Sequence, residues 1–326
     1  MKYFVVSDLH SFKSEFEKAL KKKGFKKNFD DHMLVVNGDI FDRGPESLEM
    51  KEYLDSINNK IMILGNHEFL LLETIKRGYF NSVDLHNGTV DTAIQLSGGY
   101  KTYFQEDWKK TAKKHFKIDS FGQLNHLDLQ RKIVRRLRET GITEWLIDNF
   151  YDVDENGEKG VIWDDPNNIG KSKYSIRGKP RLYQIFDDRL ILHGFFPSPD
   201  WIEFAPARGQ MHRQVVKLPD DFDLLEADLS AWMEYGCGVW SNTEYWLDQW
   251  YSCKLIDLYK YLDKKNIRHI YIGHWDRDSL KHVGKGNTVT LNDDYYNYCV
   301  DLPRIYLLDD TVVLSYNVVV ETFSIR

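Results

Sequence analysis

The chain has 326 residues, of which 42% are hydrophobic and 29% charged, with a formal net charge of −6 at pH 7. This composition excludes an intrinsically disordered chain, and the negative charge argues against nucleic-acid binding by the molecule as a whole. The 3 cysteines, an odd number, favour free thiols in a reducing compartment. No apolar run reaches the ~18 residues of a membrane span, so we expect a cytoplasmic protein without a membrane segment.

Three apolar runs near the amino terminus predict buried strands, and each run ends in polar residues. A helix follows the first run, with Ser11 as its expected N-cap and Gly24 as its stop. A second helix is expected around Leu48–Ile57. Strands that alternate with helices predict a parallel sheet, whose strand carboxyl ends line one edge. The runs and the residues that follow them are Tyr3–Val6 before Asp8, Met33–Val36 before Asp39, and Ile61–Leu64 before Asn66.

Two later apolar runs show the same pattern. Leu190–Leu192 ends at His193, and His269–Ile272 ends at His274. Because the carboxyl ends of strands line the ligand crevice of an open α/β sheet, we expect the polar residues of all five strand ends to meet.

The segment between these two groups of strands lacks the pattern. Residues 78–188, with a helical stretch near 126–139, predict a large insertion that covers or flanks the site. Near the end of the chain, Arg304–Leu308 and Thr311–Val320 predict an antiparallel hairpin. No linker divides the sequence, so we expect residues 1–326 to form one domain.

The polar residues after the five strands are of the kinds that bind divalent cations. Such cations take carboxylate, amide and imidazole ligands. Two cations about 3.5–4 Å apart need roughly six ligands, including one shared carboxylate. The sequence supplies enough side chains and therefore predicts a two-metal site. The candidates are Asp8, His10, Asp39, Asp42, Asn66, His67, His193 and His274.

These motifs resemble the calcineurin-like metallophosphoesterases, and among them the serine/threonine phosphoprotein phosphatases. Two blocks match the family's Gly-Asp-x-x-Asp-Arg-Gly and Gly-Asn-His-Glu at every defined position. They are Gly38–Gly44 and Gly65–Glu68. Shorter matches are Ser7–His10, His193-Gly194 and Gly273-His274. The resemblance implies a four-layer α/β/β/α sandwich with an inserted, partly helical cap, and it leaves most of residues 78–185 and 205–250 unassigned.

The resemblance also implies a ligand set. Asp8, His10 and Asp39 would hold one metal ion. Asp39 would bridge to a second ion, whose other ligands would be Asn66, His193 and His274. The family uses Mn²⁺-like or Fe/Zn-like ions, so we expect two divalent ions, Mn²⁺ first, with Fe, Zn or Ni as alternatives.

Three further residues gain roles from the same resemblance. His67 would be the general acid that protonates the leaving alkoxide. Asp42 would accept a hydrogen bond from His67 and fix its tautomer. Arg43 would bind the substrate phosphate with its planar guanidinium, next to Asn66. Glu68 is expected to begin a helix or to support a ligand.

The expected reaction is hydrolysis of a phosphomonoester by a hydroxide held between the two metal ions. The substrate would be a phosphoprotein, as in a serine/threonine protein phosphatase, or a small phosphate ester. One alternative is a nucleotide or nucleic-acid phosphatase or phosphodiesterase of the same superfamily. Another is a metal-binding scaffold without activity.

Two departures from the family pattern concern the substrate. The family's second phosphate-binding arginine has no clear counterpart, and Arg208 and Arg213 are candidates that the sequence does not separate. Asp276, two residues after His274, is an added ligand or, as we favour, a loop acid.

Two other segments carry phosphate-like or basic patterns. Residues 165–172 resemble a phosphate-binding P-loop, but Asp165 replaces its first glycine and opposes phosphate binding. Residues 109–138 hold ten Lys or Arg residues. We favour a solvated helix face, with Leu129, Ile133 and Leu137 packing inward. A basic rim that attracts an anionic substrate, including nucleic acid, is the alternative.

Overall fold

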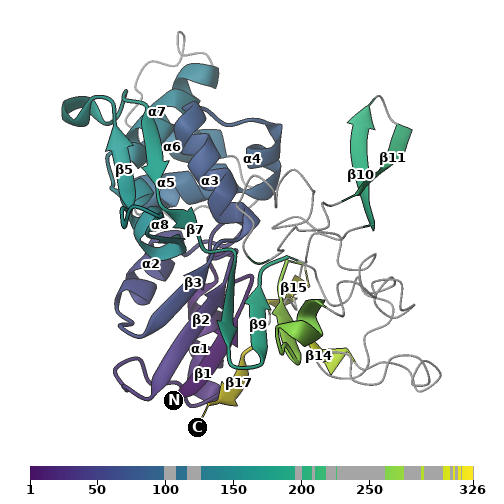
Figure 1. The fold of residues 1–326 in the computed structure, drawn as a ribbon. Coiled ribbons are helices and arrows are strands. Elements are labelled where there is room, and N and C mark those ends of the chain that lie inside the picture. Colours follow the sequence, from purple (N-terminus) through teal and green to yellow (C-terminus); the bar gives the residue numbers. More distant parts are fainter. Residues whose placement is uncertain are drawn as a thin grey trace.

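The computed structural model describes residues 1–98, 108–115, 126–194, 200–207, 210–217, 225, 261–274, 288–289, 304–308, 311–312, 315–316 and 318–325. Two β-sheets lie at its centre (Figure 1). The first has the strand order β17-β1-β2-β3, in which β1, β2 and β3 are parallel and β17 is antiparallel to β1. Its strands are β1 (Lys2–Val6), β2 (His32–Asn37), β3 (Lys60–Ile63) and β17 (Glu321–Ser324).

The second sheet has the strand order β13-β14-β12-β9-β8. Its three central strands are parallel, and the two edge strands are antiparallel to their neighbours. The strands are β8 (Tyr183–Phe186), β9 (Arg189–Leu192), β12 (His269–Ile272), β13 (Thr288–Val289) and β14 (Arg304–Leu307). β8 lies inside the segment predicted as an insertion, yet it belongs to this sheet.

Alternate residues of each strand face the two sides of a sheet. Val5 and Val35 pack with Ile191 and Tyr271 in a cluster between the two sheets. Their neighbours on the other face, such as Phe4, pack in the cluster that includes the helices. The hydrophobic alternation of β1 and β2 therefore buries both faces of the first sheet.

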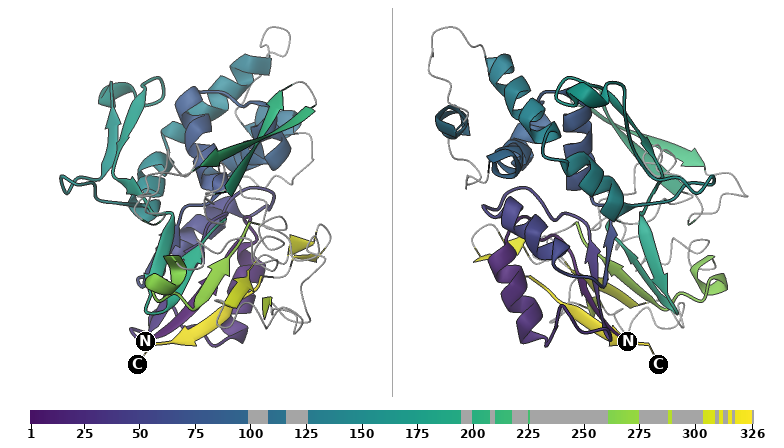
Figure 2. Two further views of the ribbon diagram at one scale, coloured as in Figure 1. Left: turned by 45° about the vertical axis from the view of Figure 1, so that its right-hand side comes forward. Right: turned by 90° about the vertical axis from the view of Figure 1, so that its left-hand side faces the viewer.

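Helices cover the outer faces of the two sheets. α1 (Lys13–Lys22) and α2 (Ser47–Asp55) lie on the outer side of the first sheet (Figure 2). Leu262 and Ile267, in and just after the helical residues 261–264, share a cluster with the outward side chains of β9 and β12. The predicted α/β/β/α layering is confirmed for the residues that the structure describes.

The predicted N-cap of α1 is wrong. Ser11 has a φ of 59°, and its hydroxyl lies 2.8 Å from the hydroxyl of Ser47 instead of bonding the helix. The first turn is satisfied by Glu46, whose carboxylate accepts from the backbone N–H of Ser14 at 2.9 Å. The predicted stop at Gly24 is confirmed, since the helix ends at Lys22 and Gly24 has a φ of 83°.

The predicted carboxy-terminal hairpin is also wrong. β14 pairs with β12 and β13 in the second sheet, and within the predicted second strand β15 (Thr311–Val312) pairs with β16 (Ser315–Tyr316). β17, which follows the predicted hairpin, pairs with β1 in the first sheet.

The elements between β3 and β8 form a cap, which lies at the top of Figure 1. No helix of the described residues is long and apolar enough to cross a lipid bilayer. A further pair of strands, β10 (Asp200–Ala207) and β11 (Gln210–Lys217), is antiparallel. The helices of the cap are α3 (Asn66–Arg77), α4 (Ser82–Asn87), α5 (Thr89–Gly98), α6 (Trp108–His115), α7 (His126–Arg138) and α8 (Ile142–Phe150). Its short strands and turn are β4 (Tyr151–Asp152), β5 (Gly160–Trp163), η1 (Pro166–Asn168), β6 (Tyr174–Arg177) and β7 (Lys179–Pro180).

The two segments singled out by their charge or motif lie in this cap. Leu129, Ile133 and Leu137 of α7 are buried, so the predicted inward face is confirmed. The P-loop-like residues connect β5 and β6, an antiparallel pair, and no α-helix follows them as a P-loop requires.

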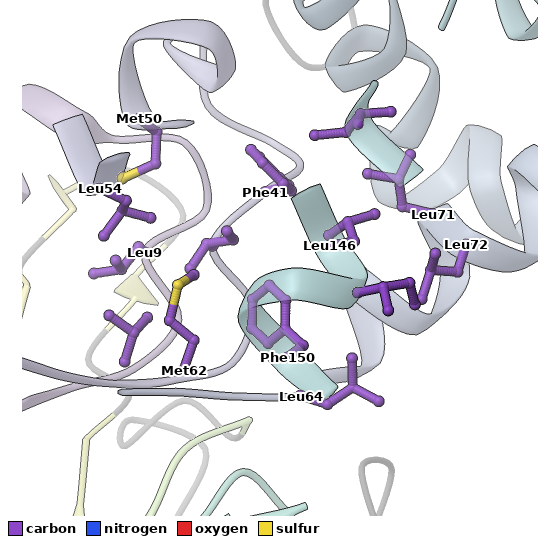
Figure 3. Packing of buried hydrophobic residues seen from close by; sticks show 14 of the residues in the cluster. Leu9, Phe41, Met50, Leu54, Met62, Leu64, Leu71, Leu72, Leu146 and Phe150 are labelled. Carbon is purple, nitrogen blue, oxygen red and sulfur yellow. The ribbon is translucent and has the colours of Figure 1, made fainter. Parts of the chain in front are cut away.

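Phe150, at the end of α8, is fully buried where the cap meets the first sheet. Figure 3 shows its ring near Leu64, which follows β3, and Leu146 of α8. The backbone of Arg181 joins the same two segments, because its N–H donates to Phe150 and its carbonyl accepts from Leu64, both at 2.8 Å.

We expect Phe150→Ala to lower the free energy of unfolding by about 3–5 kcal/mol, because it removes a large buried ring and leaves a cavity. Val153→Ala is the control, since Val153 is 56% exposed and its loss should change stability by no more than about 0.5 kcal/mol. Urea unfolding measures both. A loss below about 1 kcal/mol for Phe150→Ala would show that this ring does not hold the cap to the sheet.

Candidate metal centre

Backbone and side-chain hydrogen bonds bring the strand ends of both sheets together. The N–H groups of Asp8 and His10 donate to Gly38 and Asp39, at 3.2 and 2.9 Å, which links the loops after β1 and β2. The buried side chain of Asn37, the last residue of β2, donates to the carbonyl of Leu192 in the second sheet at 2.8 Å. The ends of β1, β2 and β9 therefore lie close together.

The loops of this site have an unusual backbone. Nine described non-glycine residues have a positive φ, and seven of them lie here. Such conformations cost on the order of 1–3 kcal/mol each and persist only where the surroundings enforce them. The seven are Asp8, His10, Ser11, Asp39, Asp42, Arg43 and His274, with φ between 44° and 73°.

Glycines allow these loops to approach one another. A Cβ at Gly65 would collide with the backbone and carboxylate of Asp39, and one at Gly273 would collide with Ser7 and Asp8. One at Gly38 would lie 2.5 Å from His193 Nδ1. The glycines of the family motifs thus keep space for the side chains that gather here.

Two groups of buried side chains have the geometry of metal sites. His10, Asp39 and His67 form one, and Asp39, His193 and His274 form the other. The first group differs from the predicted ligand set, because it contains His67, the predicted general acid, and not Asp8. Within each group the ligand atoms lie within 4.8 Å of one another. Asp39 belongs to both groups, as expected of a carboxylate shared by two cations.

The two outer histidines have fixed tautomers. His10 Nδ1 lies 3.1 Å from the carbonyl of Phe41, and His193 Nδ1 lies 2.7 Å from the carbonyl of Asn37. A carbonyl oxygen only accepts, so Nδ1 carries the proton in both rings. Nε2 of each ring therefore faces the site, where His10 Nε2 lies 3.0 Å from Arg43 Nη1 and His193 Nε2 lies 3.2 Å from Asp39 Oδ1. Metal-binding histidines are oriented by such a bond at the other ring nitrogen.

Asn66 lies beside the second group. One terminal atom of its amide is 3.0 Å from His193 Nε2 and 2.8 Å from His274 Nδ1. The same atom lies 3.0 Å from Asp39 Oδ2, so as an NH₂ group it donates to these acceptors. Turned by 180°, the amide would present its oxygen as a ligand beside imidazole and carboxylate ligands. This mixed nitrogen and oxygen set fits borderline divalent cations.

Asp8 is the sixth predicted ligand, and it lies outside both groups. It is buried, and both carboxylate oxygens accept from the backbone N–H of His274, at 3.0 and 3.1 Å. Burial raises the pKa of Asp8 to about 6, although the charge of His193 opposes this. Asp8 therefore borders the candidate centre and positions the loop of His274.

The buried charged groups of the site shift one another's pKa. Burial raises the pKa of Asp39, but the charges of His193 and His67 lower it more, so its pKa falls well below the usual range. Burial lowers the pKa of His193, but the Asp39 carboxylate raises it by more, so that the pKa is about 10. A cation that binds His193 must displace this proton, so metal affinity should rise with pH.

His67 and Asp42 form a buried pair next to the first group. His67 Nδ1 lies 2.7 Å from Asp42 Oδ2, and His67 Nε2 lies 3.7 Å from Asp39 Oδ2. Burial lowers the pKa of His67, but the Asp39 charge and the Asp42 hydrogen bond raise it above its usual value. Arg43 Nη1 lies 3.0 Å from His10 Nε2, so the predicted phosphate-binding guanidinium also reaches the site.

Glu68 holds the backbone around Asp39. Its carboxylate accepts from the N–H groups of Asp39 and Ile40, both at 2.8 Å, and from that of Gly65 at 3.2 Å. Burial and then the charge of Asp39 raise the pKa of Glu68 to about 7. Glu68 therefore connects the two motif blocks. It supports the backbone of Asp39, and it is also the N3 residue at the start of α3, so it has both of the expected roles.

One face of α5 supplies contacts that sequence reasoning missed. Thr89 donates to Asp42 Oδ2 at 2.7 Å, and Thr92 accepts from the backbone N–H of Asp42 at 2.9 Å. Gln95 donates to the carbonyl of Gly44 at 3.0 Å and accepts from the N–H of Ser47. All three are buried, and their spacing of three residues was the only sequence signal.

Some predicted residues cannot be compared. Arg208 and Asp276 lie outside the described residues, and the side chain of Arg213 does too.

The fold and the shared carboxylate define a candidate dinuclear metal site at the strand ends of a two-sheet α/β protein. A family model for calcineurin-like phosphoesterases matches residues 1–278, so the chain belongs to the calcineurin-like phosphoesterase family. The family uses a dinuclear divalent metal centre, and the two ligand groups of this chain fit it.

Curated relatives match only part of the chain. A symmetrical bis(5'-nucleosyl)-tetraphosphatase of Buchnera aphidicola subsp. Schizaphis graminum is 38% identical over 91 residues, which are 25% of this chain and 32% of that protein. The enzyme with the same name from Psychromonas ingrahamii is 37% identical over 73 residues, 22% of this chain and 26% of that one. The matches thus span about a third or less of the relatives' length.

A solved structure of a cold-active protein tyrosine phosphatase covers 98% of this chain and 73% of that one, with 15% identity and a TM-score of 0.45. A likeness at this level carries no inference about the substrate.

We expect Glu68→Gln to weaken metal binding by about 10- to 100-fold, because an amide NH₂ would face backbone N–H donors and displace Asp39. Glu73→Gln, on the same helix but away from the site loops, is the matched control. Isothermal titration with Mn²⁺ measures both affinities. Equal affinity in the two variants would mean that Glu68 does not position the shared carboxylate.

Proposed function

We propose that the protein hydrolyses phosphomonoesters with two divalent cations held by Asp8, His10, Asp39, Asn66, His193 and His274. Mn²⁺ is the expected metal. The observation that carries the proposal is the buried His67–Asp42 pair, which lies directly beside the shared carboxylate Asp39. Arg43 at the same place adds a cation for the phosphate.

Two bound divalent cations would supply a water of lowered pKa and neutralise charge on the phosphate. Side chains of the protein bind the phosphate and supply the proton. Arg43 holds phosphate oxygens with its planar fork. Asp42 keeps the Nδ1 proton of His67 in place, so Nε2 is the atom that gives a proton to the leaving oxygen.

The leaving group decides how much His67 matters. An alkoxide leaving from a serine, threonine or sugar phosphate is a strong base and needs a proton. This favours a phosphomonoesterase, including a serine/threonine protein phosphatase, because a buried, raised-pKa histidine is suited to that task.

A dinucleoside tetraphosphatase is the second candidate. The curated relatives with this name favour it. Here the leaving group is a nucleotide phosphate, which departs readily without a proton. The same metals and Arg43 would serve, and His67 would contribute little.

His67→Asn separates the two candidates. We expect it to lower kcat for phosphoserine by about 100-fold or more, whereas p-nitrophenyl phosphate, with a good leaving group, should lose less than about 10-fold. Wild-type turnover of diadenosine tetraphosphate that exceeds turnover of every monoester, with no loss in His67→Asn, would replace the first proposal by the second.

The same series tests the metal centre. Asp39→Asn should lower turnover of all substrates by at least about 100-fold and reduce the bound metal, since both cations lose a shared ligand. The exposed Asp148→Asn is its control and should behave as wild type. His67→Asn should keep its metal content. An Asp39→Asn protein that retains metal and activity would refute the shared site.

Thr89 is expected to support His67 through Asp42. Thr89→Val removes one of the two side-chain donors to Asp42 Oδ2 and should lower kcat for phosphoserine by about 10-fold. KM and the turnover of p-nitrophenyl phosphate should stay within about 2-fold, and Thr89→Ser should restore the loss. An equal loss for both substrates would indicate a general structural defect instead.

A further inference from the structure

The two segments that were set apart in the sequence, basic helix α7 and the P-loop-like turn, meet at one cavity. Its volume is about 180 Å³, the room of about six waters in the liquid. Figure 1 shows α7 and the β5 hairpin in the cap, away from the two sheets. The cavity is lined by Arg131, Arg135 and Arg138 of α7, Lys171 and Gly170 of the turn, and Gly78 after α3.

The four cations of the cavity differ in their partners. Arg138 is buried, and its guanidinium donates to the carbonyls of Ile75 at the end of α3 and of Ser172 in the turn. Among the described residues, Arg131 makes one long, exposed ion pair, with Asp128 at 3.7 Å. Arg135 and Lys171 have no ion-pair partner among the described residues.

Gly170 allows the P-loop-like turn to pack closely against α7. A Cβ on Gly170 would lie 2.7 Å from Arg135 Cγ and 2.9 Å from Glu139 Oε1. A side chain there would therefore push the arginine away. Gly78, with a φ of 85°, lets α3 end beside Arg138.

The acids near the cavity do not line it. Glu139 Oε2 lies 3.0 Å from Arg136, and Asp128 pairs with Arg131. Asp165 belongs to the same turn as Lys171, and its backbone N–H donates to Ser172 Oγ. The carboxyl ends of α3 and α7 contribute about half a negative charge each. The residues that line the cavity include four cations and no acid, in a chain whose net charge is −6.

We propose that this cavity is an anion-binding site, separate from the candidate metal centre, that takes a diphosphate group. Guanidinium groups bind phosphate oxygens in pairs, and Arg135 and Lys171 are available for them. Two available cations, one for each of two adjacent phosphates, match a diphosphate better than a single phosphate. A concave site of this size suits a small anion, whereas a polynucleotide would need an extended basic surface.

The experiment titrates inorganic pyrophosphate into the protein as purified, without added divalent metal, by isothermal calorimetry. The test variant is Arg135→Gln/Lys171→Gln. The matched control is Lys132→Gln/Lys173→Gln, which removes two charges from the same helix and the same hairpin outside the cavity. Neither variant alters Arg138, whose loss would free the end of α3. Thermal unfolding of each variant checks that it is folded.

We expect wild type and control to bind pyrophosphate equally, and the test variant to bind at least about tenfold more weakly. ADP in a parallel titration distinguishes a nucleotide from free pyrophosphate as the source of the diphosphate. Arg43→Ala should bind as wild type does. Equal binding by the test variant and the control, loss of binding only in Arg43→Ala, or binding of an unphosphorylated oligonucleotide but not pyrophosphate would each overturn the proposal.

Discussion

The carboxylate of Asp39 is the group around which the site is built. It is 1% exposed, and an ionised carboxylate at such a depth is stable only with opposite charge or hydrogen-bond donors beside it. His193 lies 3.2 Å from Asp39 Oδ1, and the backbone N–H of His67 donates to the same oxygen at 3.0 Å. These contacts come from both sheets, so the position of one charge depends on how the two sheets pack.

This constraint also explains the backbone. Asp39 has a φ of 52°, a conformation that costs free energy, and Glu68 holds it there by accepting from two consecutive N–H groups. Gly65 must lack a Cβ because Asp39 occupies that space. The glycines and Glu68 of the two motif blocks are therefore needed to place one side chain, independently of any contact with a substrate.

The cap is part of the same structure. Helix α5 comes from the segment that carried no recognisable motif, yet Thr89 and Thr92 bond Asp42, and Gln95 bonds the loop next to it. The pair formed by His67 and Asp42 is thus held from the sheet on one side and from the cap on the other. A change in how the cap packs, for example at Phe150, would therefore alter the contacts that position His67, the proposed general acid.

The sequence alone determined the elements with local signals. The strands before Asp8, Asp39 and Asn66 were predicted because short apolar runs that end in polar residues are buried strands of a parallel sheet, and the motif blocks identified the residues that gather there. It did not determine the partners of the terminal strands, because β14 and β17 pair with strands that are far away in the sequence, and only the position of each sheet decides the pairing. The same holds for Ser11, whose hydroxyl met Ser47 of another loop instead of its own helix. The roles of Thr89, Thr92 and Arg138 are visible only in the tertiary structure. Nothing in their own helices distinguishes them, and their partners are brought beside them by the fold.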